Sequence, residues 1–302
     1  MDTLLTAVAL AVLTASTAFS QIKTGADFLN IPVGARPVGM GNAYTALAND
    51  VTSLHWNPAG LALMNHRELG AMHSQWLLNT QYNFLGFGAP SSMGSIAGSV
   101  AVLSQGNEEG RGANREKTGT IKAQDQVFSL GFAKNLGELK GGINTKLISS
   151  QIAGFRAQSY ALDMGMLYPV SSSLGFGAAL QNLGPGMRFI SQRDPLPLTL
   201  AAGVSYRFLH GLAVALDVKE NLVSKKNQIN LGTEYSVLPI LTLRGGYLAS
   251  LAGQRQVGGL GKNLNGLSAG LGFNFLGNRM DYAFTPFGLL GDTHRISLNV
   301  RF

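Results

Sequence analysis

The sequence contains no cysteine among its 302 residues, and only 13% of its residues are charged. The lack of cysteine excludes disulfide bridges, thiol catalysis and zinc sites built from thiolates. The charged fraction is about half of the roughly 25% found in a typical soluble domain, so an ordinary charged globular surface is not expected. Beyond residue 20, no apolar run approaches the ~20 residues of a membrane-spanning helix, which excludes a helical membrane protein.

Glycine and apolar residues take the place of the missing charge. The 39 glycines make up about 13% of the chain, nearly twice the usual ~7%. Apolar residues make up 45%, too many for a disordered chain, while the mean hydropathy is only +0.14. The net charge of +7 comes from scattered residues rather than a basic run, so nucleic-acid binding is not expected. This combination is typical of a transmembrane β-barrel, whose hydrophobicity is spread over alternate positions.

The first twenty residues differ in character from the rest of the chain. The stretch from Leu4 to Ala18 is apolar and rich in small residues, and it is followed by Phe19 and Ser20. This pattern predicts a secretory signal peptide that is cleaved near Ser20/Gln21. No basic residue precedes Leu4, so a buried helix remains as the alternative.

The last ten residues show the strictest alternation in the sequence. Apolar residues occupy every second position, at Ile296, Leu298, Val300 and Phe302, and the positions between them are polar or charged. A shift of one residue would place two arginines in the apolar environment, so the register of this strand is strongly specified. An alternating strand that ends in phenylalanine is the form that the barrel-assembly machinery of the outer membrane recognises, and these four residues are its expected contact.

Alternation with a period of two residues continues through most of the chain from about residue 67. It predicts fourteen strands, an even number, with lengths near the ~9–11 residues that cross a bilayer at a tilt. After the first predicted hairpin, whose outer turn is short, short connections alternate with long ones, as turns and loops do on the two sides of an outer-membrane barrel. The expected strands lie near 67–76, 79–89, 94–104, 126–134, 139–150, 157–168, 173–183, 197–207, 211–220, 228–237, 240–250, 266–275, 278–286 and 293–302.

The two faces of these strands differ in size as well as in polarity. One face is bulky and apolar, and the other is small or polar with many glycines. A soluble β-sandwich would bury the bulky face, whereas a membrane barrel turns it toward lipid. Periodicity does not separate these two folds, but the even strand count and the connection lengths favour the barrel. The predicted fold class is therefore all-β, a 14-stranded antiparallel transmembrane β-barrel of the bacterial outer membrane.

The segment before the barrel lacks this alternation, and we expect it to form a small N-terminal hatch inside the lumen. Asn42 is expected to cap a short helix over 43–48, and Asn57 with Pro58 is expected to fix a turn. Small residues would allow a close approach to the barrel wall. Arg36 is expected to pair with one lumenal carboxylate, and the candidates are Asp163, Asp217 and Glu234. The chain is thereby divided into a signal peptide (1–20), an N-terminal hatch segment (21–66) and a transmembrane β-barrel (67–302).

Two sets of hatch residues are candidates for function. The hatch motif would fix the backbone of the segment, and it comprises Arg36, Gly39, Gly41, Asn42, Asn57, Pro58 and Gly60. The second set is largely apolar and could line a pocket for a hydrophobic ligand between hatch and wall. It comprises Phe28, Leu29, Met40, Tyr44, Leu47, Trp56 and Leu61. The alternative for this second set is that it only packs the hatch.

The sequence shows no pattern for catalysis. No Gly-x-Ser-x-Gly nucleophile elbow occurs, and the five histidines lack metal-binding spacing. His294 and Ser297 lie three residues apart on a predicted strand, so their side chains point to opposite faces. The glycine-rich stretch 258–262 lacks the residues that a phosphate-binding P-loop requires. We therefore expect no enzyme, no cofactor, no metal site and no nucleic-acid partner.

Three parts of the chain resemble one protein family. The hatch stretch 34–62, with the sequence GARPVGMGNAYTALANDVTSLHWNPAGLA, resembles the N-terminal motif of the PorV/PorQ outer-membrane proteins. That family is itself similar to the FadL-type long-chain fatty-acid transporters. Residues 181–186 with 194–198, and 281–288 with 290–297, resemble the central motif and the closing hairpin of the family. The resemblance implies a fourteen-stranded barrel with an N-terminal hatch, in agreement with the strand count.

The resemblance also implies a function. Its main implication is a component of type IX protein secretion and cell-surface attachment, in which case deletion of the gene would block surface delivery of secreted cargo. The alternative is a FadL-like channel for uptake or export of small hydrophobic molecules such as long-chain fatty acids. A second alternative is a structural barrel that anchors a partner protein. The expected partners are accordingly outer-membrane lipid, the barrel-assembly machinery, and either type IX components and cargo or a hydrophobic small molecule.

Overall fold

The computed structural model describes residues 24–77, 80–106, 108–111, 116–208, 211–250, 266–288 and 291–302. The predicted signal peptide lies outside the described residues. The helical elements are η1 (Asp27–Asn30), α2 (Ala35–Gly39), α3 (Ser53–Trp56) and η2 (Pro58–Leu63). The strands are β1 (Glu68–Gln75), β2 (Gln81–Ser91), β3 (Gly94–Ser104), β4 (Glu108–Arg111), β5 (Lys117–Ile121), β6 (Ala123–Leu136), β7 (Leu139–Ile152), β8 (Phe155–Pro169), β9 (Leu174–Leu183), β10 (Met187–Phe189), β11 (Gln192–Asp194), β12 (Thr199–Arg207), β13 (Leu212–Asn221), β14 (Lys226–Leu238), β15 (Leu241–Ser250), β16 (Leu267–Phe275), β17 (Asn278–Pro286) and β18 (Asp292–Arg301).

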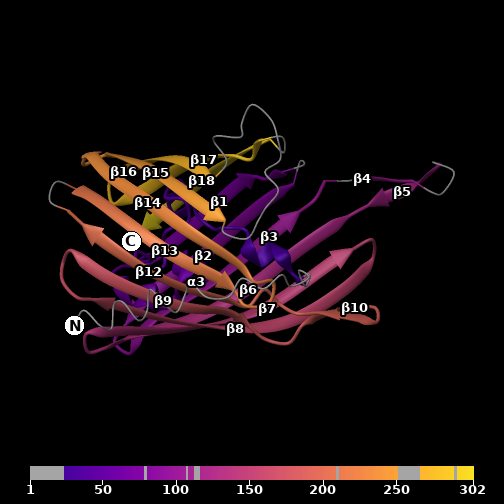
Figure 1. Cartoon of the computed structure of the whole chain (residues 1–302), viewed down its shortest axis with the longest axis horizontal. Helices are drawn as coiled ribbons and strands as arrows, with labels where there is room; N and C mark the ends of the chain where they lie inside the picture. Colours follow the sequence, from indigo (N-terminus) through magenta and orange to yellow (C-terminus); the bar gives the residue numbers. More distant parts are fainter. Residues whose placement is uncertain are drawn as a thin grey trace.

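Fourteen of these strands close into one antiparallel barrel (Figure 1). Each barrel strand pairs with the barrel strands before and after it in the sequence, and β1 pairs with β18 to close the cylinder. The closing pair places Glu68 opposite Arg301 and Gln75 opposite His294. All fourteen predicted strands are present, with bounds that differ from the prediction by three residues at most. The predicted 14-stranded antiparallel barrel is therefore confirmed.

Two further strand pairs, β4–β5 and β10–β11, project beyond the barrel wall at the same end, on the right of Figure 1. We call this end the loop end, and the opposite end, which carries tight turns such as 137–138, the turn end. The predicted strands leave 105–125 and 184–196 as connections, and the structure corrects this by adding these two strand pairs. Strands β10 and β11 have only three residues each, too few to show a period.

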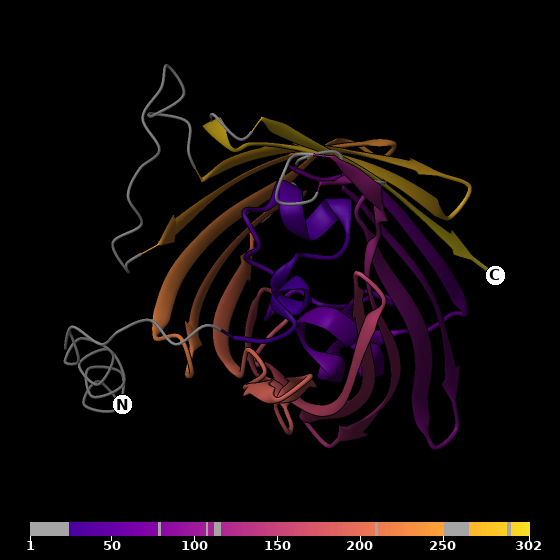
Figure 2. The same cartoon turned by 90° about the vertical axis from the view of Figure 1, so that its right-hand side faces the viewer.

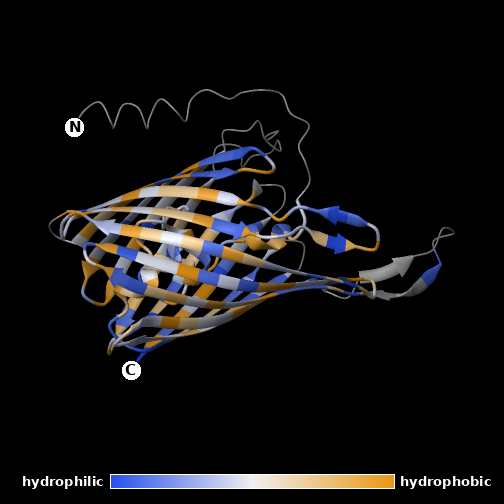
Figure 3. Cartoon of the chain, turned by 90° about the horizontal axis from the view of Figure 1, so that it is seen from below, coloured by the Kyte–Doolittle hydropathy of each residue, from blue (hydrophilic) through white to orange (hydrophobic). Residues whose placement is uncertain are grey.

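The outside of the barrel carries large apolar side chains that alternate with residues facing the lumen. Figure 3 shows hydrophobic and hydrophilic residues in succession along the strands. Leu147 and Tyr160, for example, are 67% and 64% exposed. In the final strand Ile296 and Leu298 are exposed while Arg295 is buried, which is the register that the sequence predicted. This arrangement is the reverse of a soluble sandwich and is the one that a barrel surrounded by lipid requires.

Residues 24–64 lie inside the barrel, and we call this segment the plug (Figure 2). Its four helical elements have four to six residues each and are joined by turns. In the part of the chain that the structure describes, no helix has the length and apolar character to cross a membrane.

The predicted helix over 43–48 does not form, and Asn42 does not cap it. Asn42 has a φ of 67°, in the left-handed region, whereas an N-cap residue is normally extended. Side chains of the wall and of the plug hold this backbone in another conformation and occupy the Thr45 carbonyl, which a helix would use. The amides of Tyr44 and Thr45 both donate to Asp217, and the carbonyl of Thr45 accepts from Asn57. Tertiary contacts therefore override the local helix preference.

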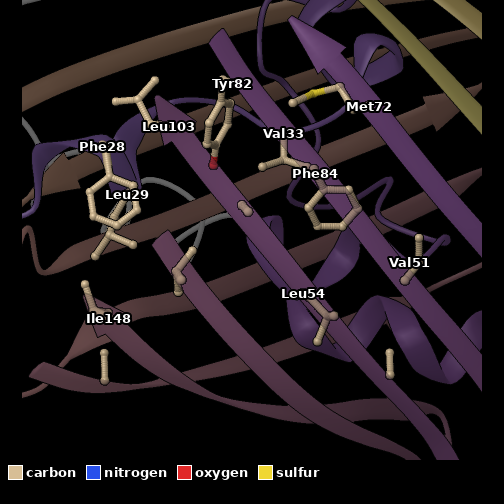
Figure 4. Packing of buried hydrophobic residues seen from close by; sticks show 14 of the residues in the cluster. Phe28, Leu29, Val33, Val51, Leu54, Met72, Tyr82, Phe84, Leu103 and Ile148 are labelled. Carbon is tan, nitrogen blue, oxygen red and sulfur yellow. The ribbon is translucent and has the colours of Figure 1, made fainter. Parts of the chain in front are cut away.

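The hydrophobic core lies between the plug and one side of the barrel wall (Figure 4). We call this contact the apolar seam. The plug contributes Phe28, Leu29, Val33, Val51, Leu54, Leu61 and Met64 to it. The wall strands β1, β2, β3, β6 and β7 contribute Met72, Tyr82, Phe84, Leu103, Val127 and Ile148. A barrel has no second sheet to pack against, so the plug supplies the missing half of the core.

Candidate functional site

The interface between plug and wall is the candidate functional site, because any passage through the barrel has to cross it. Its closest contacts involve glycines on the strands. A Cβ atom at Gly142 would overlap the backbone of Pro58 and Ala59, and one at Gly165 would overlap the Asn57 side chain. A Cβ atom would likewise overlap the backbone of Thr45 at Gly177, of Met40 at Gly232, and of Met40 and Gly41 at Gly246. The glycines on the lumenal face that the sequence showed therefore let the plug backbone pack directly against the strands.

On the side opposite the apolar seam, the plug is held by a series of buried charges that we call the ionic chain. The plug residue Arg36 pairs with Glu234 on β14 at 2.8 Å, and Glu234 pairs in turn with Arg244 on β15 at 2.6 Å. Arg244 lies 2.9 Å from Asp281 on β17. Arg279 then pairs with Asp281 at 2.8 Å and returns to the plug at Asp50, at 2.7 Å.

The ionic chain contains three arginines and three carboxylates, so its formal charge sums to zero. Such a balance matters because an unpaired buried charge is strongly destabilising, whereas a fully paired network is tolerated. Asp50 illustrates the effect. Burial by itself would raise the pKa of its carboxyl, but Arg279 and then Arg36 hold that pKa below its usual value. The carboxylate therefore stays ionised, and it also accepts a 3.0 Å hydrogen bond from the Tyr44 hydroxyl.

Of the three carboxylates that the sequence offered to Arg36, the structure selects Glu234. The other two have different partners. Asp163 pairs with Lys146 at 2.8 Å, and Asp217 accepts the Tyr44 and Thr45 amides at 2.9 and 2.8 Å. The remaining members of the ionic chain were not identified from the sequence: Asp50, Arg244, Arg279 and Asp281. The three on the strands occupy lumen-facing positions, and a charged residue there is the signal that could have found them.

The hatch-motif residues make contacts that fix the backbone of the plug. Asn57 donates from Nδ2 to the carbonyls of Thr45 and Met166, while its Oδ1 accepts from the Ala59 amide. It thereby ends α3 and starts η2, with Pro58 as the first residue of that helix. The three glycines lie at close approaches: Gly39 against Gly270, Gly41 against Gly246 and Tyr247, and Gly60 against Ala48 and Ser53.

The predicted ligand-lining residues are all buried, but they do not surround one cavity. Phe28, Leu29 and Leu61 belong to the apolar seam. A second cluster contains the other four, Met40, Tyr44, Leu47 and Trp56, with Ala43, Ala48 and Ala215. Leu29 and Trp56 also border a cavity of about 310 Å³. The structure therefore places most of this set in the packing of the plug.

The predicted assembly residues run along the outside of β18 and its end, from the middle of the strand to the turn end. Ile296, Leu298 and Phe302 are exposed, Val300 is half-buried, and the Phe302 ring stacks on Phe87 at 6.2 Å. Their recognition by assembly machinery stays a prediction.

His55 in the plug should make the fold sensitive to acid. Burial, together with the positive charges of Lys146, Lys219 and Arg295, lowers the pKa of its imidazole well below 6.5. Below pH 6.5 the imidazole is therefore protonated in the unfolded chain but neutral in the folded chain. The free energy of unfolding consequently falls as the pH decreases. We expect a loss of about 1 kcal/mol between about pH 7 and pH 5.5.

The measurement is the temperature at which the folded band is lost on an SDS gel, followed against pH. His55→Gln should flatten the profile in this interval, whereas His73→Gln, at an exposed position, should leave its slope unchanged. Equal slopes for the parent and His55→Gln would contradict the assignment.

Comparison with known proteins gives matches to sequence and to fold. The model of the Uncharacterised protein family (UPF0164) matches residues 3–121. Two UPF0164 proteins of Treponema pallidum (strain Nichols) are 27% and 28% identical over 161 and 172 residues. These alignments cover 52% and 54% of this chain, and 41% and 48% of the relatives. The chain therefore spans about half the length of the curated relatives it matches.

Several solved structures share the fold at low sequence identity. The toluene transporter TodX of Pseudomonas putida has a TM-score of 0.63 at 13% identity, and the alignment covers 88% of this chain and 96% of TodX. The toluene transporter TbuX of Ralstonia pickettii has a TM-score of 0.63 at 14% identity, covering 89% and 98%. A FadL homologue of Pseudomonas aeruginosa has a TM-score of 0.56 at 11% identity, covering 88% and 97%. The FadL-like part of the predicted resemblance is thereby supported at the level of the fold, and the PorV/PorQ subgroup stays a prediction.

Proposed function

We propose that this protein is a channel of the bacterial outer membrane for small hydrophobic molecules, in the size range from monoaromatic hydrocarbons to long-chain fatty acids. The observation that carries the proposal is the asymmetry of the plug. One side of the plug meets the wall through the apolar seam, and the other side is fixed by the ionic chain. The barrel fold shared with toluene transporters supports the same substrate class.

The asymmetry defines where the channel would open. Separating the ionic chain leaves buried charges without partners, at about 3–5 kcal/mol for each broken pair. Separating the apolar seam breaks mainly non-polar contacts, which a hydrophobic solute replaces with contacts of its own, together with two hydrogen bonds, from the Val51 amide to Glu68 and from Asn144 to the Leu54 carbonyl, and no ion pair of the ionic chain. The path of lowest free energy therefore runs along the seam, between Val51 and Leu54 of the plug and strands β1, β2 and β6.

A membrane location follows from the exterior of the barrel. Side chains such as Leu130, Leu147 and Phe128 are at least half exposed, and soluble proteins rarely expose apolar patches of this extent. Lipid is the environment in which such a surface is stable.

A disulfide across the apolar seam should close the channel reversibly. Val51 touches the position that a Cβ at Gly70 would occupy, so Val51→Cys/Gly70→Cys places two sulfurs within bonding reach. The chain has no cysteine of its own, so the pair forms without competition. We expect the oxidised double variant to lose most toluene uptake into cells carrying the protein, and the reduced form to regain it.

The single variants Val51→Cys and Gly70→Cys serve as matched controls, since neither can form the bond. Both should take up toluene at the same rate with and without reductant. Undiminished uptake by the fully oxidised double variant would show that the seam is not the path.

The role in type IX protein secretion that the resemblance predicts, and the role as an anchor for a partner, stay predictions. Neither draws support from the plug–wall contacts. The channel proposal and the secretion role are separable, because surface delivery of cargo and hydrocarbon uptake are independent measurements on the same deletion strain.

A further inference from the structure

A cavity of about 310 Å³ lies toward the loop end of the lumen, between the plug and strands β9, β12, β13 and β14. Among the described residues, thirteen of the sixteen that line it are polar or charged, and only Leu29, Pro32 and Trp56 are apolar. Its volume is at the lower end of the roughly 300–1,000 Å³ found for small-molecule sites. A hydrocarbon would leave these polar groups without partners, so the cavity is built for a different class of ligand from the apolar seam.

The cation of the cavity is Lys219, which comes from a lumen-facing position of β13. Its side chain is only 12% exposed. Its Nζ donates to the carbonyl of Asn42 at 2.9 Å and lies 4.3 Å from the centre of the Trp56 ring. Asp217 lies 3.8 Å away, beyond hydrogen-bond distance, and its Oδ2 already accepts from Tyr44 and Thr45. The charge of Lys219 is therefore held in place but only partly compensated.

The other charges of the lining leave the cavity positive. Lys226 adds a second cation at an exposed position, and Asp27, which accepts from the Thr24 hydroxyl, is the one carboxylate among the described lining residues, so two lysines face one carboxylate. A carboxylate group is the complement to this arrangement, because a charge-assisted hydrogen bond to a partly buried lysine is stronger than a neutral one.

Neutral polar groups complete the lining. Asn221, Gln228 and Thr199 contribute amides and a hydroxyl from three strands. Within the described residues, the Oδ1 atom of Asn42, which belongs to the lining, finds no hydrogen-bond donor. Buried acceptors of this kind are satisfied by donors such as hydroxyl groups.

We infer that this cavity binds a small hydroxylated carboxylate, with the carboxylate on Lys219 and the hydroxyls on the surrounding amides. The ligand is polar, so the site is distinct from the hydrocarbon path along the apolar seam. Either site can exist without the other.

The test is a titration of the purified full-length protein in detergent with sodium glucuronate and, separately, with glucose. The two share a ring and most hydroxyls, and only glucuronate carries a carboxylate. Trp76→Phe leaves Trp56 as the single tryptophan and a reporter in contact with Lys219. We expect glucuronate to change its fluorescence with an affinity at least roughly tenfold above that of glucose, since one charge-assisted contact is worth about that factor.

Lys219→Met should abolish the preference for glucuronate, whereas Lys134→Met, at an exposed position on the turn end, should retain it. Gln228→Ala keeps Lys219 and should weaken glucuronate and glucose by similar factors, so it tests the site if Lys219→Met does not fold. The inference is overturned if the protein binds neither compound saturably, if it binds both equally, or if Lys219→Met retains the preference. Because no hydrocarbon is used, failure here leaves the channel proposal untouched.

Discussion

Gly246→Val is expected to unseat the plug and turn the closed barrel into a leaky one. A Cβ atom at this position would overlap the backbone of Met40 and Gly41, and backbone cannot move aside as a side-chain tip can. Gly41 cannot yield, because its φ of +60° and its own contact with Tyr247 hold it against β15. Overpacking of this kind costs about 3 kcal/mol or more when the neighbour is fixed.

The matched control for this variant is its neighbour on the same strand. Gly245→Val points to the outside, where a Cβ atom would meet only the Thr233 methyl at an ordinary 3.7 Å. Both variants introduce the same residue into β15, so strand propensity and hydrophobicity are equal. Swelling of liposomes in a small sugar should increase for Gly246→Val and remain at the parent rate for Gly245→Val. Equal, low leakage for both would show that the plug does not depend on this contact.

Arg36→Met is expected to destabilise the docked plug by about 3–5 kcal/mol, the range for removing one partner of a buried ion pair. The loss has several parts. Glu234 keeps Arg244 but loses its bidentate bond from Arg36, with both contacts at 2.8 Å. The Tyr44 hydroxyl and Asn49 Oδ1 lose hydrogen bonds of 2.9 and 2.8 Å. The temperature at which the folded gel band disappears and the rate of small-solute leakage both report the effect.

A double variant separates the ionic chain from a general packing effect. Once Glu234→Gln has removed the partner, the additional change Arg36→Met should cost less than it does alone, and the difference should reach at least about 1 kcal/mol for directly contacting residues. Arg207→Met, at an exposed position on the turn end, is the control and should stay within about 0.5 kcal/mol of the parent. Strict additivity of the two lumenal changes, or unchanged heat stability and leakage in Arg36→Met, would refute the role of the ionic chain.

Much of the barrel could be read from the residues because its pattern is local. In a strand with one lipid face and one lumenal face, apolar and polar residues have to alternate. The residue types at positions such as Arg295 and Ile296 therefore predict which side each one faces, without knowledge of any partner strand. The short strands β10 and β11 were not predicted, because three residues are too few to show a period. The expected helix over 43–48 did not form because Asn57 occupies the Thr45 carbonyl and Asp217 fixes the Thr45 amide from the wall, and local propensity cannot anticipate either contact.

The sequence by itself determined the strand count, the inward and outward faces, and the presence of an arginine that required a lumenal partner. Only the tertiary structure decided that this partner is Glu234, that Asp50 and Arg279 close the same ionic chain, and that Gly246 lies beneath Gly41. The physical reason is one of range. Alternation is imposed on neighbouring residues by the lipid and the lumen, whereas the ionic-chain contacts between plug and wall join groups 198 and 229 residues apart, and the curvature of the closed barrel sets which of them meet.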